Sequence, residues 1–137
     1  MSFAEGKEMK GKKMPEEIVV SIVDDDISVR RSTQRLLRSS GFRAEAFASA
    51  EEFLDSKSRA ETACLILDLR MPGMNGLELQ LRLSQNGHRV PIIFLSAQAS
   101  EEDERSALSA GAVRFLRKPI SKEALLGAIR DALKRTS

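Results

Sequence analysis

Residues 18–27 read IVVSIVDDDI, a mostly β-branched apolar run that is followed directly by Asp24, Asp25 and Asp26. β-branched residues favour strands, and a short continuous apolar run is typical of a strand buried on both faces. Three adjacent carboxylates repel one another unless a cation compensates their charge. The stretch therefore predicts a buried strand with a cation-binding site at its carboxyl end.

The length and composition are those of one ordinary globular domain. The chain has 137 residues, of which 42% are hydrophobic and 31% are charged, and single cores usually contain roughly 100–200 residues. No apolar run approaches the roughly 18 residues that a membrane span needs, and the N-terminus has no apolar core of the secretory kind. The single cysteine, Cys64, cannot form an internal disulfide. We therefore predict a cytoplasmic protein without a membrane segment.

The excess positive charge lies at the N-terminus. The net charge is +2, and residues 1–14 contain four Lys and two Glu, which leaves the rest of the chain balanced. A charge-biased segment of this kind is typical of a solvated arm rather than of a nucleic-acid contact. We predict a flexible tail over residues 1–16 and one domain over residues 17–137.

Strand and helix signals alternate five times along the chain. The strand-like segments are Ile18–Val23, Arg43–Phe47, Cys64–Leu69, Pro91–Ala97 and Ala112–Leu116. The helix signals are Ser28–Ser40, the capping box Ser49-x-x-Glu52, Asn75–Ser84, Ser100–Ala110 and Ser121–Lys134. Short strands joined through helices pair in parallel, and right-handed crossovers cover both faces of the sheet. The sequence predicts a doubly wound α/β fold in which Arg43–Phe47 is an edge strand and the other four strands are hidden on both faces.

Polar residues follow four of these strands. In a doubly wound sheet the functional crevice lies outside the carboxyl ends of the strands, where this sequence has Asp24–Asp26, Asp68, Ser96, Lys118 and Pro119. Hard divalent ions prefer carboxylate, carbonyl and water oxygens, so the acidic cluster predicts a Mg²⁺ site. Beside Mg²⁺ and Lys118, Asp68 would stay ionised and act as a nucleophile toward phosphorus, with the Ser96 hydroxyl donating to a phosphoryl oxygen.

The chain resembles the receiver domains of bacterial two-component response regulators, most closely the FixJ-type branch. The likeness covers Ile18 to about Arg135. It depends on four motifs in matching order, which are IVDDD (22–26), LDLRMPGMNG (67–76), FLSA (94–97) and KP (118–119). The resemblance implies a flavodoxin-like receiver fold with a five-stranded parallel sheet in the order 2-1-3-4-5.

The resemblance also implies an acceptor and its metal ligands. Asp68 would be the phospho-acceptor and one of the ligands of Mg²⁺. Asp25 would bind the metal directly, Asp24 would bind it through water, and the backbone carbonyl of Arg70 would be a further ligand, with the Arg70 side chain beside the phosphoryl group. For Asp26 two interpretations stay open, a cap on the following helix or a metal contact.

Further positions would form the switch of the family. Ser96 would be the switch hydroxyl and Phe115 the switch aromatic, while Lys118 would clamp the phosphate ahead of a cis peptide bond to Pro119. Gln98 would flank the phosphoryl group. The chain departs from the commoner pattern at two places, because Ser96 stands where Thr is more frequent and Phe115 where Tyr often stands. The first change removes a methyl group that stiffens the rotamer, and the second removes a phenolic hydroxyl.

The function implied is a phosphorylation-dependent switch in a two-component phosphorelay. Asp68 would take a phosphoryl group from the phosphohistidine of a sensor histidine kinase in a Mg²⁺-dependent step and later lose it to water. The domain would catalyse only these two reactions of its own and would turn over no metabolite. A homodimer would form on phosphorylation through the helix Ser100–Ala110, the strand Ala112–Leu116 and the helix Ser121–Lys134. DNA would be contacted only through a transcription-regulator output domain absent from this chain.

Two alternatives remain. A degenerate receiver would bind Mg²⁺ without accepting phosphate and act as an interaction module. Asp24-x-Asp26 also resembles the nucleophile motif of haloacid-dehalogenase-type phosphatases, with Asp24 attacking and Asp26 as general acid or base. That family needs an acidic pair at a later strand end, whereas the acids beyond Lys118 are Glu123 and Asp131, both in a helix pattern.

Overall fold

The computed structural model describes residues 17–134, so the predicted tail over residues 1–16 and the predicted domain end at 135–137 lie outside it. The strands are β1 (Val19–Val23), β2 (Arg43–Phe47), β3 (Thr62–Asp68), β4 (Ile92–Ser96) and β5 (Arg114–Arg117). They form one sheet in the order β2-β1-β3-β4-β5, and all neighbours pair in parallel. This confirms the predicted α/β fold and strand order.

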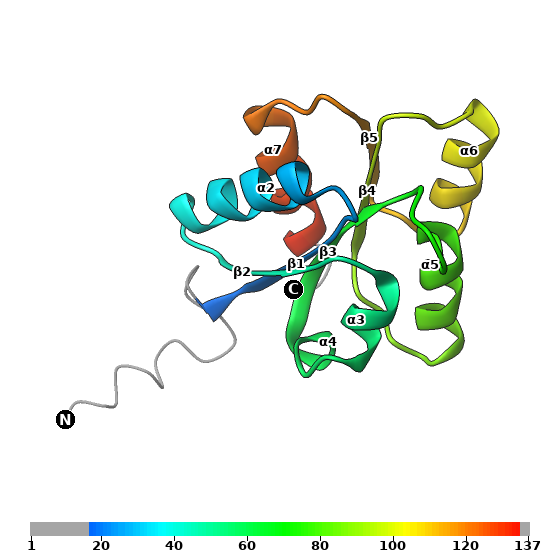
Figure 1. Ribbon diagram of the computed structural model, residues 1–137, viewed down its shortest axis with the longest axis horizontal. Helices are drawn as coiled ribbons and strands as arrows, with labels where there is room; N and C mark the ends of the chain where they lie inside the picture. The colour runs from blue at the N-terminus through cyan, green and yellow to red at the C-terminus, as the bar shows by residue number, and fades with distance from the viewer. Residues whose placement is uncertain (1–16, 135–137) are drawn as a thin grey trace.

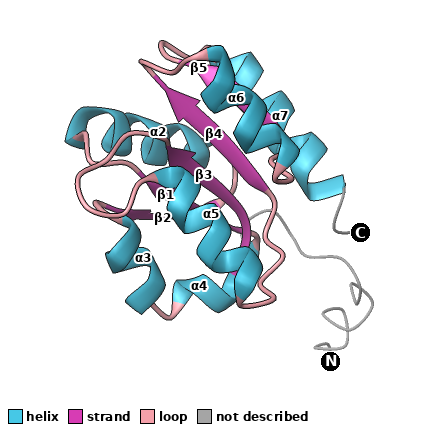
Figure 2. Cartoon of the chain, turned by 90° about the vertical axis from the view of Figure 1, so that its right-hand side faces the viewer, coloured by secondary structure: helices cyan, strands magenta, loops and turns pink. Residues whose placement is uncertain are grey.

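Helices cover both faces of the sheet (Figure 1). They are α2 (Ile27–Ser39), α3 (Ala50–Asp55), α4 (Ser58–Glu61), α5 (Gly76–Gln85), α6 (Glu101–Ser109) and α7 (Lys122–Lys134). α2 and α7 lie together on one face, while α3, α5 and α6 lie on the other; Figure 2 shows α3 and α5 in front of the sheet with α2 behind it. Within residues 17–134, no helix combines the length and the hydrophobicity that crossing a bilayer requires.

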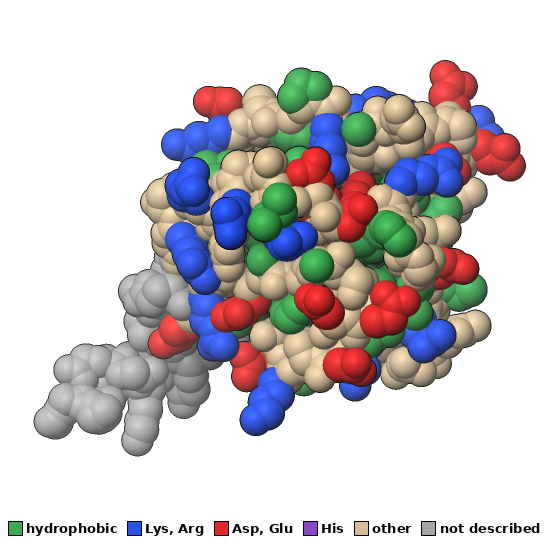
Figure 3. All heavy atoms as spheres, viewed as in Figure 1, with side chains coloured by type: hydrophobic (Ala, Val, Ile, Leu, Met, Phe, Trp, Pro, Cys, Tyr) green, Lys and Arg blue, Asp and Glu red, His purple; other side chains and the backbone are tan. Residues whose placement is uncertain are grey.

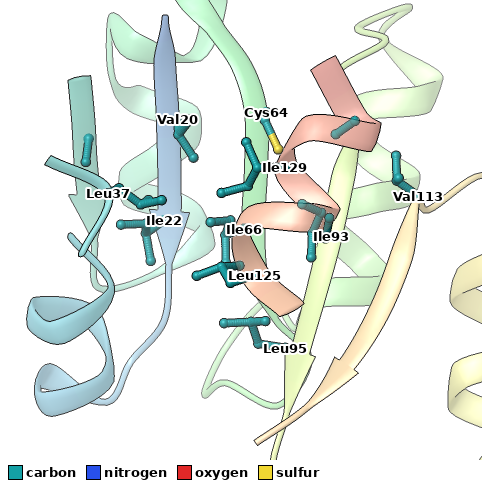
Figure 4. Close-up of a cluster of buried hydrophobic side chains, with 13 residues drawn as sticks. Val20, Ile22, Leu37, Cys64, Ile66, Ile93, Leu95, Val113, Leu125 and Ile129 are labelled. Atoms are coloured by element: carbon teal, nitrogen blue, oxygen red, sulfur yellow. The ribbon is translucent and has the colours of Figure 1, made fainter. Parts of the chain in front are cut away.

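Alternate residues of the central strands supply two separate cores. In β3, Cys64 and Ile66 pack toward α2 and α7 (Figure 4), whereas Leu65 and Leu67 pack toward α3, α5 and α6. This division follows from the two-residue period of a strand. Burial raises the pKa of the Cys64 thiol to about 12. Cys64 is therefore a small core residue with no thiolate at neutral pH.

Four strands differ from their predicted bounds, β1 and β4 by one residue at one or both ends and β3 and β5 by more. β3 begins at Thr62 rather than Cys64, and the Thr62 hydroxyl lies 2.6 Å from the Ser21 hydroxyl of β1 within the protein interior. The prediction that the last strand is hidden on both faces is wrong, because β5 runs over Arg114–Arg117 with both ends exposed and its middle half-buried. The reason is topological, since β5 is the edge strand beyond β4. The short helix α4 was not predicted at all.

Gly76, the first residue of α5, contacts the end of β3 too closely for any side chain. A Cβ atom at this position would lie 2.5 Å from the carbonyl oxygen of Asp68 and 2.9 Å from the ring of Phe94. Gly76→Ala is therefore expected to lower the free energy of unfolding by about 1–3 kcal/mol, because backbone and a buried ring must both shift. Chemical denaturation monitored by circular dichroism measures the change.

Gly127→Ala in α7 is the matched control for this prediction. A Cβ atom there would meet its nearest neighbour, the Arg130 guanidinium, at 3.8 Å, which is ordinary contact. Alanine is expected to stabilise that helix by about 0.5–1 kcal/mol. Equal unfolding midpoints for the two variants would contradict the steric argument at Gly76.

Candidate functional site

The carboxyl ends of four strands meet at one edge of the sheet and bring the predicted residues together. Asp24 follows β1, Asp68 ends β3, Ser96 ends β4 and Lys118 follows β5. Parallel pairing places these ends side by side, with Asp68 opposite Leu95 of β4. Residues up to 94 positions apart in sequence, Asp24 and Lys118, are thus in hydrogen-bond contact.

Three carboxylates form the centre of this edge. Ligand oxygens of Asp24, Asp25 and Asp68 all lie within 4.8 Å of one another, with Asp24 and Asp68 buried and Asp25 exposed. The pKa of Asp68 is raised from 3.8 to about 7, first by burial and then by the charge of Asp24, although the Lys118 ammonium lowers it. Carboxylates held this close repel one another, and a set of hard oxygen donors with an open, exposed member fits a divalent cation.

Lys118 is the cation that the chain itself supplies. Its Nζ atom lies 3.0 Å from Oδ2 of Asp24 and 3.5 Å from Oδ1 of Asp68. Burial alone would lower the pKa of Lys118, but the hydrogen bond to Asp24 and the charges of both carboxylates outweigh burial and raise it. The ammonium is therefore charged and shared between the two carboxylates. The peptide bond from Lys118 to Pro119 is cis, which is the geometry that the resemblance implied.

Asp26 is a helix cap rather than part of the carboxylate cluster. Its Oδ1 atom accepts hydrogen bonds from the backbone amides of Ser28 at 2.9 Å and Val29 at 3.3 Å, at the N-terminus of α2. This is the standard arrangement of an N-cap, and it decides between the two interpretations of this residue. Asp24 is 1% exposed and accepts bonds from Lys118 and from the Asp26 amide. Both acids of the phosphatase alternative are thus already engaged in other contacts.

Ser96 and Phe115 lie on the adjacent strands β4 and β5. The Ser96 hydroxyl is buried and donates a hydrogen bond of 3.0 Å to the carbonyl of Gln98, in the loop that leads to α6. The Phe115 ring is half-buried and stacks on Phe94 with the centroids 5.9 Å apart and the planes at 27°. The Arg117 guanidinium lies over the Phe115 ring, 5.5 Å from its centroid. The residues predicted as the switch are therefore tied to the loop before α6.

Arg70 has a partner that the sequence did not indicate. Its guanidinium donates a hydrogen bond of 2.5 Å to Oδ2 of Asp103, a residue of α6 that is 33 positions away. Asp103 also forms the capping box of α6 with Ser100. A second arginine, Arg117, reaches the same turn and binds Glu104 at 2.8 Å. No motif marks these pairs, because charged residues on a solvated helix have many equivalent arrangements until the fold is known.

Comparison with known proteins gives one consistent family. A family model described as the response regulator receiver domain matches residues 20–130. Response regulator protein TodT of Pseudomonas putida is 47% identical over 116 residues, which cover 85% of this chain and 51% of TodT. Transcriptional regulatory protein FixJ of Azorhizobium caulinodans is 36% identical over 124 residues, which cover 90% of this chain and 59% of FixJ.

A solved structure agrees with these relatives. The structure of response regulator StyR matches with a TM-score of 0.80 and 44% identity, covering 87% of this chain and 60% of that chain. The chain spans about half the length of the curated relatives it matches.

Proposed function

Because the chain belongs to the family of response regulator receiver domains, we propose that it is a switch in which Asp68 accepts a phosphoryl group from the phosphohistidine of a sensor histidine kinase. The observation that carries the proposal is the position of Asp68, a buried carboxylate between two acidic neighbours and the ammonium of Lys118. Such a group is well placed to attack an electrophile once its charge is balanced.

In the proposed transfer, an oxygen of Asp68 attacks phosphorus and the P–N bond to the kinase imidazole breaks. The imidazole keeps the electron pair of the P–N bond and leaves as neutral histidine, because its second ring nitrogen carries a proton. The other product is an acyl phosphate on Asp68, which water later hydrolyses to inorganic phosphate. Mg²⁺ held by Asp24, Asp25, Asp68 and the carbonyl of Arg70 would offset negative charge on the phosphoryl oxygens. Lys118, already 3.5 Å from Asp68, supplies a positive charge to the same oxygens.

The switch would then run through Ser96. Its hydroxyl donates to the Gln98 carbonyl in the present state, and donation to a phosphoryl oxygen instead would release the loop before α6. Phe115, which adjoins that loop through Arg117, would move with it. The surface of α6, β5 and α7 would change conformation as a result, and the shift in population between its two conformations would be the signal.

We propose that phosphorylation promotes a homodimer through this α6–β5–α7 surface. Arg114 of β5 pairs with Asp131 of α7, and Arg117 pairs with Glu104 of α6, so paired charges of both signs line the surface. Exchange of such pairs between two copies would give charge-matched association. An unchanged sedimentation coefficient after phosphorylation would rule out the dimer.

The wider role follows from the same proposal. The chain would catalyse only its own phosphorylation and dephosphorylation, in the cytoplasm, and turn over no metabolite. DNA would be contacted through an output domain that is not among these 137 residues. The alternative is a degenerate receiver that binds Mg²⁺ and a protein partner without accepting phosphate.

Intact-mass measurement with a small-molecule phosphoryl donor tests the proposal. The chain is incubated with acetyl phosphate and Mg²⁺, and in parallel with acetyl phosphate and EDTA. One added phosphoryl group with Mg²⁺ and none with EDTA is the expected result. No added mass in either sample, with Mg²⁺ binding confirmed by calorimetry, would instead support the degenerate receiver.

Mg²⁺ is also expected to stabilise the fold, because it relieves the repulsion among Asp24, Asp25 and Asp68. A ligand at ten times its Kd raises the free energy of unfolding by about 1.4 kcal/mol. Thermal unfolding with and without Mg²⁺ measures this gain. Asp25→Asn should remove most of it, whereas Asp26→Asn, which changes a helix cap, should keep it. A gain of equal size in native chain and Asp25→Asn would place the bound cation elsewhere.

A further inference from the structure

We propose that Arg70 exchanges partners when Asp68 is phosphorylated, leaving Asp103 on α6 and pairing with the phosphoryl group. The inference rests on the proposed function and adds a residue pair to it. Asp103 then acts as a positioning residue, because it holds the Arg70 side chain in the unphosphorylated state and sets how readily that side chain is given up. Occupation of Asp68 thereby changes the contacts of the first turn of α6.

The position of Arg70 makes the exchange geometrically simple. Arg70 is two residues beyond Asp68, so chain geometry keeps the two Cα atoms within about 7 Å. Its side chain is 60% exposed, and the ion pair that holds it is the one to Asp103. A long side chain with one exposed anchor can turn to a new anion without disturbing a core.

Asp103 loses little when Arg70 leaves. Its Oδ2 atom also accepts a hydrogen bond of 3.0 Å from the Ser100 amide, and its own amide donates to the Ser100 hydroxyl. These capping-box bonds keep Asp103 in place at the N-terminus of α6, where a carboxylate is favourable. The exchange therefore leaves no buried charge without a partner.

The strengths of the two pairs favour the exchange. An exposed ion pair contributes at most about 1 kcal/mol. A phosphoryl group has a charge of about −1.5 to −2 and three acceptor oxygens, and a guanidinium can bind two of them at once. The phosphoryl group is thus the stronger competitor for Arg70, although the pairing with Asp103 is strong enough to be populated in its absence.

The first turn of α6 is sensitive to the loss of one arginine. It contains four consecutive acids, Glu101–Glu104, and acidic side chains stand at the upper right of Figure 3, on the side where Figure 1 shows α6. Arg70 and Arg117 each neutralise one of them, through Asp103 and Glu104. When Arg70 leaves, Arg117 is left to hold this turn and the Ala99 carbonyl before it. The exchange thus adds a second link from Asp68 to α6, independent of Ser96.

A double-mutant cycle with beryllofluoride, a stable mimic of the phosphoryl group, tests the exchange. Because the chain has no Trp or Tyr, affinity in the presence of Mg²⁺ is measured by titration calorimetry. Asp103→Asn keeps an oxygen for the Ser100 amide but weakens the hold on Arg70, and it should tighten binding by about fivefold. Arg70→Gln should weaken binding, and adding Asp103→Asn to it should then have no further effect.

Glu102→Gln is the matched control, since it removes one charge from the same turn at an exposed residue outside both arginine pairs. Its affinity should stay within about twofold of the native value. An Asp103→Asn effect no larger than this, or one that persists in the Arg70→Gln background, would overturn the exchange while leaving Asp68 as acceptor. Absence of any beryllofluoride binding to the native chain would instead overturn the proposed function, and the exchange with it.

A structure of the Mg²⁺–beryllofluoride complex provides an independent readout. The expected result is an Arg70 guanidinium in contact with fluoride and more than about 4 Å from the Asp103 carboxylate, beyond the limit of an ion pair. A guanidinium that still binds Asp103 in that complex would rule out the exchange.

Discussion

Asp68→Asn is expected to abolish phosphoryl uptake completely and, at the same time, to make the unphosphorylated chain more stable in EDTA. Uptake is lost because the amide cannot act as a nucleophile toward phosphorus. Stability rises because Asn removes a negative charge that lies buried beside Asp24 and Asp25. Intact mass after incubation with acetyl phosphate and Mg²⁺ measures the first effect, and chemical denaturation in EDTA measures the second.

The pKa of Asp68 fixes the pH range of the stability gain. Burial first, and then the charge of Asp24, raise this pKa from 3.8 to about 7 in the folded chain. The folded state therefore holds the Asp68 proton more tightly than the unfolded state does. Stability contributed by the protonated carboxyl is fully present below about pH 4 and is lost as the pH rises through 7. A shift of about three units corresponds to a gain of up to about 4 kcal/mol for Asn at higher pH.

Asp26→Asn separates the role of Asp68 from a general effect of charge at this edge of the sheet. Like Asp68→Asn, it removes one carboxylate, but this one is the exposed N-cap of α2, and Asn can cap a helix equally well. Phosphoryl uptake by Asp26→Asn should be unchanged, and the free energy of unfolding of this variant should depend on pH in the same way as that of the native chain. If Asp68→Asn still carries a phosphoryl group, another residue is the acceptor. If the stability of Asp68→Asn depends on pH in the same way as that of the native chain, Asp68 is not the destabilising carboxylate.

The fold could be predicted largely because its strands are short apolar runs separated by helix caps and glycines. Parallel pairing then placed Asp24, Asp68 and Lys118 at one edge without any knowledge of distances. The sequence contained no clear signal for elements that are short or lie at the edge of the sheet. The helix Ser58–Glu61 has four residues and no apolar period, so nothing distinguished it from a loop. β5 looked like a buried strand, although its place at the sheet edge exposes Arg114 and Arg117.

The site could be predicted less completely than the fold. Residue type and strand-end position indicated the carboxylate cluster and Lys118. They did not show whether Asp26 is a helix cap or a metal ligand, and the hydrogen bonds from two backbone amides identify it as a cap. The pairing of Arg70 with Asp103 depends on how the fold brings the first turn of α6 to the loop that follows β3. Such a contact joins two solvated segments, and composition does not determine which of the available partners a surface arginine takes.

Lys118→Met is expected to destabilise the chain by about 3 kcal/mol in EDTA at neutral pH, because it breaks a largely buried ion pair from one side. Asp24 is 1% exposed and would lose its partner at 3.0 Å. Asp68 would lose the group that lowers its pKa, so more of it would be protonated. Phosphoryl uptake should slow by about 100-fold or more, as expected when one charge-stabilising donor is removed. Chemical denaturation and the rate of mass gain with acetyl phosphate and Mg²⁺ measure the two effects.

Lys122→Met tests whether the loss of any lysine on this side of the sheet has the same effect as the loss of Lys118. Lys122 begins α7, is exposed and forms no ion pair within residues 17–134. Its loss should change the free energy of unfolding by less than about 0.5 kcal/mol and leave uptake intact. The charge argument further requires that Lys118→Met cost less stability in an Asp68→Asn background, since one of the two carboxylates that the ammonium balances is then neutral. If the loss is the same in both backgrounds, or if Lys118→Met unfolds at the same midpoint as Lys122→Met, Lys118 does not hold the carboxylate cluster together.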